Sequence, residues 1–131
     1  MTSLIWCTSV DCGNAYELSE WWKPVLGYED VPDDPNLPSH PECLIRDPET
    51  GHRLLFIEVP EGKQVKNRMH LDLAPREGTR DEEVARVVGL GAKQLDDRRE
   101  PDGKGWVVLA DPEGNEFCIL RSAAERAQTA T

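Results

Sequence analysis

Three residues of this sequence, His70, Glu116 and Cys118, have side chains able to hold a metal ion or contact a polar ligand. Glu116 and Cys118 are two positions apart, so on a β-strand their side chains share one face. A histidine and a cysteine together suit soft Zn²⁺ better than Mg²⁺. The alternatives are structural: a histidine bonded to a backbone carbonyl, a cysteine acting as a small buried hydrophobe and a solvated glutamate beside a turn.

Other side chains could complete a binding site. Glu58 shares a strand face with Leu54 and Phe56, although it stands near a strand end. Trp6 and Trp106 fall in segments that read as strands, where indole rings could line a cavity and bind planar or cationic ligands. Their alternative is ordinary core packing.

Several kinds of chemistry have no support in the sequence. The four cysteines lack C-x-x-C spacing, which argues against zinc-finger and thioredoxin-type sites. No G-x-S-x-G, P-loop or dinucleotide fingerprint occurs. With no basic, apolar leader at the start of the chain, we expect reduced thiols and a cytoplasmic protein.

The net charge of the chain limits the classes of partner that it can bind. The formal net charge is −10, from 15 Lys and Arg against 25 Asp and Glu. Binding to nucleic acid or to an anionic membrane depends on cationic residues, so we expect neither partner. No apolar stretch has the length that spans a bilayer.

A repeat organises the 131 residues. Leu26-Gly27 recurs as Leu90-Gly91, and Asp47-Pro48-Glu49 recurs as Asp111-Pro112-Glu113, both at an offset of 64. Since the chain is about twice this offset in length, each half should carry the same unit.

Each half predicts the element order β-α-β-β-β. An apolar stripe from Leu18 to Leu26 predicts the first helix, within which Pro24 should cause a kink or an early end. Thr79 and Glu82 have capping-box spacing and mark the start of the second helix. Gly27 and Gly91 suit helix C-caps. The expected strands are 4–10, 28–31, 42–46 and 53–59 in the first half, and 69–73, 93–96, 105–110 and 116–121 in the second.

The predicted fold class is α+β: two βαβββ modules in tandem, forming a curved mixed sheet around a cavity within a single domain, 1–131. Module 1 covers about 4–59, a polar linker 60–68, module 2 about 69–121, and a flexible tail 122–131. A concave cleft between the modules is a default small-molecule site.

Most of the chain, from about Leu4 to Arg121, resembles the glyoxalase-like proteins of the vicinal oxygen chelate (glyoxalase/bleomycin resistance/dioxygenase) superfamily. The matching runs are Val10-Asp11-Cys12, Leu18, Trp22 and Leu26-Gly27; Leu54-Leu55-Phe56, Val59-Pro60-Glu61-Gly62-Lys63, Asn67-Arg68 and His70-Leu71-Asp72-Leu73; and the closing run from Trp106 to Leu120.

The resemblance implies a homodimer and a divalent metal held by four strand positions. His70 stands where a histidine ligand is expected, and Cys118 where a glutamate is usual. Trp6, Cys7 and Thr8 offer no usual ligand on the first strand, and the fourth strand offers only Glu58 just beyond its expected position. The metal ligands to test are therefore His70, Glu116 and Glu58, and the ions Zn, Ni, Mn or Fe, although this depleted set favours a site with no metal cofactor.

Three functions follow from this reading. The first is a small-molecule-binding protein with a degenerate metal site, whose ligand lies in the inter-module cavity against His70, Trp6, Trp106 and Cys118. The second is a metal-dependent lyase, isomerase or dioxygenase acting on a small oxygenated substrate. The third is a dimer module without a ligand. Depletion of the ligand set favours the first, and bound metal would favour the second.

Overall fold

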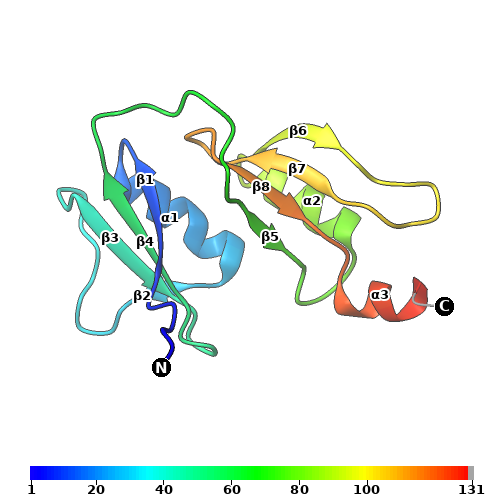
Figure 1. Cartoon of the computed structure of the whole chain (residues 1–131), viewed down its shortest axis with the longest axis horizontal. Coiled ribbons are helices and arrows are strands. Elements are labelled where there is room, and N and C mark those ends of the chain that lie inside the picture. Colours follow the sequence, from blue (N-terminus) through cyan, green and yellow to red (C-terminus); the bar gives the residue numbers. More distant parts are fainter. Residues whose placement is uncertain (130–131) are drawn as a thin grey trace. The chain divides into compact units, whose positions relative to one another are not determined.

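The computed structural model describes residues 1–129, which fall into two compact units, Met1–Lys63 and the part of the chain from Gln64 onward. Each unit has one four-stranded mixed sheet with a helix packed on one face (Figure 1). The α+β class and the tandem βαβββ modules are therefore confirmed. Each sheet is open and does not close into a barrel.

The sheet of the first unit has the order β1-β4-β3-β2, with β1 parallel to β4 and the other pairs antiparallel. Apolar side chains alternate along β3 and β4, so one face is buried beneath α1; Ile45, Leu54 and Phe56 are fully buried there. The elements are β1 (Thr8–Cys12), α1 (Ala15–Leu26), β2 (Glu29–Asp30), β3 (Glu42–Arg46) and β4 (Arg53–Glu58).

The helix α1 differs from its prediction at Pro24. We expected a kink or an early end, but the helix continues to Leu26. Proline removes one N–H donor, and at this position the loss falls in the last turn. The last turn stays hydrogen-bonded, because the N–H groups of Gly27 and Tyr28, which follow the helix, both donate to the Lys23 carbonyl. Gly27 has φ 72°, the left-handed C-cap that the sequence predicts.

The second unit repeats this plan with the sheet order β5-β8-β7-β6. One face, with Leu109, Phe117 and Ile119 fully buried, packs beneath α2, which contributes Val84 and Val87. The elements are β5 (Leu71–Leu73), α2 (Arg80–Gly89), β6 (Lys93–Asp97), β7 (Val107–Ala110), β8 (Glu116–Ile119) and a third helix, α3 (Ala123–Thr129).

The capping box predicted at Thr79 is present. The Thr79 hydroxyl accepts the N–H of Glu82, and the Glu82 carboxylate accepts the N–H of Thr79 at 2.9 Å. Two orphan donors at the start of α2 are thereby satisfied.

The repeated Asp-Pro-Glu segments form equivalent tight turns. Asp47 and Asp111 are both buried, and each carboxylate accepts the N–H two residues later, at 2.8 Å from Glu49 and 2.9 Å from Glu113. Because each buried carboxylate accepts an N–H group of its own turn, it fixes the connection between the last two strands of its unit.

Within the segment expected to be a flexible tail, 122–131, the structure has the helix α3 over Ala123–Thr129. Ser122 and Glu125 satisfy each other's backbone N–H groups at 2.9 and 3.1 Å, a second capping box. Residues 130–131 of the expected tail lie outside the described residues.

Strand ends also differ from the prediction. The first strand begins at Thr8 rather than at Leu4, and Leu4 and Ile5 are 79% and 84% exposed. The segment expected from Gly105 becomes a strand at Val107. Within residues 1–129, none of the helices combines the length and apolar character needed to cross a bilayer.

Candidate functional site

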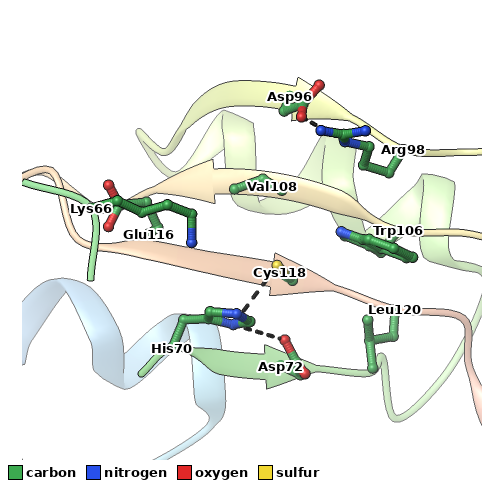
Figure 2. A pocket seen from close by; sticks show the side chains of 10 residues that line it. All are labelled: Lys66, His70, Asp72, Asp96, Arg98, Trp106, Val108, Glu116, Cys118 and Leu120. Atoms are coloured by element: carbon green, nitrogen blue, oxygen red, sulfur yellow. Dashed lines mark hydrogen bonds and ion pairs between the residues drawn. The ribbon is translucent and has the colours of Figure 1, made fainter. Parts of the chain in front are cut away.

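A cavity of about 430 Å³ lies on the sheet of the second unit. Strand residues alternate between two faces, so the residues next to the buried Phe117 and Leu109 point away from α2. The cavity occupies this outward face, and all its lining residues belong to the second unit (Figure 2). They are Lys66, His70, Asp72, Asp96, Arg98, Trp106, Val108, Glu116, Cys118 and Leu120.

A row of directly paired residues forms the floor. Asp72 on β5 pairs with Cys118 on β8, which pairs with Val108 on β7, which pairs with Asp96 on β6. Paired residues in a sheet lie side by side on one face. The row therefore crosses all four strands of the unit with its side chains directed to the cavity.

His70 lies beside this row, just before β5 begins. Its Nδ1 is 3.1 Å from Oδ1 of Asp72 and 4.0 Å from Sγ of Cys118. In the tautomer with its proton on Nδ1, that N–H donates to the Asp72 carboxylate; in the other tautomer Nδ1 has the lone pair that a cation needs. His70 and Asp72 have side chains 34% and 49% exposed, whereas Cys118 is buried.

Cys118 is a poor nucleophile in this setting. Burial raises the pKa of its thiol, and the nearby negative charge of Asp72 raises it further. At neutral pH the thiol is therefore protonated and nearly inert. A bound cation would reverse this situation, because metal coordination displaces the thiol proton.

The donor atoms of His70, Asp72 and Cys118 lie within 4.8 Å of one another. Nitrogen, oxygen and sulfur donors at this separation can converge on one ion, and the combination suits Zn²⁺. The residues present therefore fit a divalent metal, with His70 and Asp72 open to the cavity.

The two ends of the cavity differ in character (Figure 2). At one end Lys66 lies near Glu116, whose Oε1 accepts the N–H of Asn67 at 2.8 Å. At the other end lie Trp106, 43% exposed, and Leu120. A ligand spanning the cavity would meet Lys66 and Glu116 at one end, and an indole with the neighbouring Arg98 guanidinium at the other.

Four residues singled out in the sequence come together here: His70, Trp106, Glu116 and Cys118 all line the cavity. Trp6 and Glu58 do not, because both belong to the first unit.

Trp6 and Glu58 make structural contacts in the first unit. The Arg53 guanidinium lies 4.4 Å from the centre of the Trp6 ring. Glu58 stands on the face that packs against α1, where its Oε2 accepts the N–H of Ala15 at 3.1 Å. Its carboxylate therefore caps the start of α1.

Sequence reasoning missed Asp72, Lys66 and Arg98. A signal for Asp72 was present, since it is two residues from His70 and so on the same strand face. Its position opposite Cys118 depends on the β5–β8 register, which no local pattern gives.

Comparison with known proteins agrees with this architecture. A family model described as a glyoxalase-like domain matches residues 7–120. The chain belongs to this family. No curated protein sequence matches the chain.

Solved structures similar to this glyoxalase-like domain share its fold at low sequence identity. The fosfomycin resistance protein FosX from Listeria monocytogenes, solved with Mn(II) and sulfate, is 14% identical over 100% of both chains, with a TM-score of 0.67. A glyoxalase/bleomycin resistance protein/dioxygenase family enzyme from Burkholderia phytofirmans is 16% identical over 87% of this chain and 94% of its own, with a TM-score of 0.65. A possible glyoxalase from Bacillus cereus is 14% identical over 91% and 99%, with a TM-score of 0.64.

Proposed function

We propose that this glyoxalase-like domain binds a small organic ligand in the cavity on the second sheet. The observation that carries the proposal is the cavity itself. Its volume of about 430 Å³ falls in the roughly 300–1,000 Å³ range of small-molecule sites. Its lining joins an exposed indole to a histidine, carboxylates and two cations on one face.

Each part of the lining has a role in this function. Trp106 and Leu120 supply apolar contact area for a flat part of the ligand. His70, held by Asp72, presents Nε2 as an acceptor or a metal ligand in a fixed ring orientation. The Cys118 thiol is part of the floor. The net charge of −10 also argues against a nucleic acid as the partner.

The distribution of tryptophans gives a direct test. Protein labelled with 5-fluorotryptophan has four fluorine resonances; Trp106 belongs to the second unit, whereas Trp6, Trp21 and Trp22 belong to the first. A library of small aromatic and heteroaromatic acids, amines and phosphonates would be added, and the Trp106→Phe variant would assign its resonance. We expect at least one compound to shift Trp106 while the other three stay unchanged.

The His70→Ala variant should weaken that shift, and His40→Ala, in the first unit, should leave it intact. If no compound moves the Trp106 resonance at about 1 mM, where even weak ligands with millimolar Kd bind, the ligand site is wrong.

A second candidate function is metal-dependent catalysis on a small oxygenated substrate, as a lyase, isomerase or dioxygenase. The close grouping of His70, Asp72 and Cys118 donor atoms favours it. FosX, a structural neighbour, was solved with Mn(II). A bound divalent ion would supply Lewis-acid stabilisation of an oxyanion. His70 and Asp72 would hold it at the exposed side of the floor.

Metal content separates the two functions. Purified protein would be analysed for metals before and after incubation with Zn²⁺, Ni²⁺, Mn²⁺ or Fe²⁺, with His70→Ala and His40→Ala as test and control. Near-stoichiometric metal that His70→Ala removes supports the catalytic function. Protein that takes up none of these ions contradicts the metal-dependent mechanism, and the fluorine experiment then decides whether a ligand binds.

We further propose that the protein is cytoplasmic and acts as a homodimer. The four cysteines are free thiols, as in proteins of reducing compartments. Light scattering coupled to size-exclusion chromatography would give the mass: a value twice that of the 14.7 kDa chain supports the dimer, and a monomer mass contradicts it.

A further inference from the structure

Arg80, the first residue of α2, has a buried guanidinium; the residue is only 5% exposed. Its Nη1 lies 3.1, 3.0 and 3.1 Å from the carbonyl oxygens of Gly103, Lys104 and Gly105. Its Nε donates to Oδ1 of Asp81 at 3.1 Å. Burying a charge is costly unless the charge is paired and hydrogen-bonded, and here it is both.

These three carbonyls belong to the connection between β6 and β7, residues 98–106. The two ends of this loop carry cavity residues, Arg98 and Trp106, whose backbones pair directly: the Arg98 N–H donates to the Trp106 carbonyl at 2.9 Å. Two further backbone hydrogen bonds close the loop: the Glu100 N–H donates to the Lys104 carbonyl, and the Gly103 N–H donates to the Glu100 carbonyl. The position of the loop therefore decides where both cavity side chains lie.

The loop is packed tightly enough to have one arrangement. Gly105 has φ +91°, and a Cβ at this position would lie 2.0 Å from the carbonyl oxygen of Arg98. Only glycine allows the two backbone segments to approach so closely.

One side of the loop is anchored by ion pairs, and the other side faces the cavity. On the anchored side Arg99 pairs with Asp97 and with Asp81, the same carboxylate that pairs with Arg80. On the cavity side lie Arg98 and Trp106. A network of charges on one side of the hairpin thus holds the backbone whose other side faces the ligand.

We propose that Arg80 is a positioning residue for the ligand site: its guanidinium, with Nη1 within hydrogen-bond distance of three successive carbonyls, sets the position of Trp106 and Arg98 on the cavity wall. Packing alone would not require this chemistry, since an apolar side chain could fill a buried position at lower desolvation cost. The planar guanidinium holds Nε on Asp81 and Nη1 on the loop carbonyls in one fixed geometry, whereas a lysine ammonium offers a single nitrogen. The consequence for ligands rests on the proposed function, but the positioning of the loop does not.

The test compares Arg80→Lys and Arg80→Met with Arg86→Lys, a control on the same helix whose guanidinium pairs with Glu83 at the surface. Two measurements need no ligand: the fluorine spectrum of 5-fluorotryptophan-labelled protein, and amide hydrogen exchange across 98–105. In both Arg80 variants we expect a displaced or broadened Trp106 resonance, with Trp6, Trp21 and Trp22 unchanged.

We also expect amides in 98–105 to exchange at least about tenfold faster in these variants, because the loop loses the contacts of the guanidinium, while β5 and β8 keep their protection. Arg86→Lys should change neither measurement. An unchanged Trp106 resonance together with unchanged exchange in a folded Arg80→Lys protein would overturn the proposal. So would uniform loss of protection over the whole second unit in both variants, since Arg80 would then act on stability alone.

A third measurement connects the loop to the ligand. Any compound found to shift Trp106 should bind Arg80→Lys at least about tenfold more weakly than Arg86→Lys. Equal affinity would contradict the role in ligand binding. If no compound binds wild-type protein, the proposed function fails, and the fluorine and exchange data still decide whether Arg80 positions the loop.

Discussion

The carboxylate of Glu125 accepts the backbone N–H of Arg80 at 2.6 Å, which ties α3 to the first residue of α2. The same oxygen accepts the N–H of Ser122 at 2.9 Å, so it caps α3 as well. Two helices, joined through residues 45 positions apart along the chain, therefore share one capping group.

Replacing Glu125 with alanine should remove both caps and lower the free energy of unfolding by about 1–2 kcal/mol. Urea unfolding followed by circular dichroism would measure the change. Glu113→Ala offers a comparison at a turn glutamate outside this contact. Equal effects of the two substitutions would contradict the shared cap.

Glu125 also predicts a pH dependence. Burial opposes its ionisation, but the N–H groups of Ser122 and Arg80 outweigh burial and hold the pKa of Glu125 below its ordinary value of 4.5. A depressed pKa in the folded state means that the carboxylate's stabilisation is complete above pH 4.5 and is lost as the pH falls through the folded pKa. The stability difference between wild type and Glu125→Gln should therefore stay constant from pH 5 to 7 and shrink below 4.5. A difference independent of pH down to pH 2 would be inconsistent with this pKa.

Gly105 and Gly103 form a matched pair for testing the loop. Both have φ +91°, but a Cβ on Gly103 meets nothing within 4 Å, whereas on Gly105 it would strike the Arg98 carbonyl. Gly103→Ala should cost about 1–2 kcal/mol for the left-handed backbone. Gly105→Ala should cost about 1–3 kcal/mol more and displace Trp106. Thermal unfolding and the fluorine spectrum would report the two effects, and similar costs would argue against the close approach.

The second Asp-Pro-Glu turn should be sensitive to mutation of its aspartate. Asp111 accepts N–H groups from both Glu113 and Asn115, at 2.9 and 3.0 Å, and its Oδ2 also accepts the Asn115 side chain at 3.1 Å. Asp111→Ala should lower the free energy of unfolding by about 1.5–3 kcal/mol, because buried donors lose a charged acceptor. Chemical denaturation would measure this loss, and an unchanged free energy of unfolding would contradict the role of Asp111 in its turn.

The proposed metal site contains a sulfur donor, which predicts the ion that it would prefer. Cys118→Ala removes a soft ligand, so it should weaken Zn²⁺ binding by at least about tenfold while changing Mn²⁺ binding less. Competition with a chromophoric zinc indicator and paramagnetic relaxation by Mn²⁺ would measure the two affinities. An equal loss for both ions would show that Cys118 acts through packing rather than as a ligand.

Local signals in the sequence predicted most of the fold. The 64-residue offset located both turns, and the Thr79 capping box located the start of α2. The helix α3 carried the same type of signal at Ser122 and Glu125, but the small, polar composition of that segment masked it. The continuation of α1 past Pro24 depends on bonds from Gly27 and Tyr28, which composition does not reveal.

The site was predicted only in part, because its pieces meet through strand register. His70 and Cys118 have recognisable chemistry, but the pairing of Asp72 with Cys118 depends on how β5 aligns with β8. Arg98 and Trp106 are joined by a hairpin whose geometry depends on Arg80, a residue with no sequence motif. Long-range contacts of this kind are fixed by tertiary packing rather than by spacing along the chain.

In the β6–β7 hairpin, the residues that anchor the backbone are different from the residues that face the cavity. Arg80, Asp81 and Arg99 secure its backbone from one side, while Arg98 and Trp106 project from the other. Selection, or a protein engineer, could therefore exchange the two projecting side chains for others without disturbing the anchored backbone. Ligand preference in this chain should be readily evolvable at positions 98 and 106, and closely restricted at position 80.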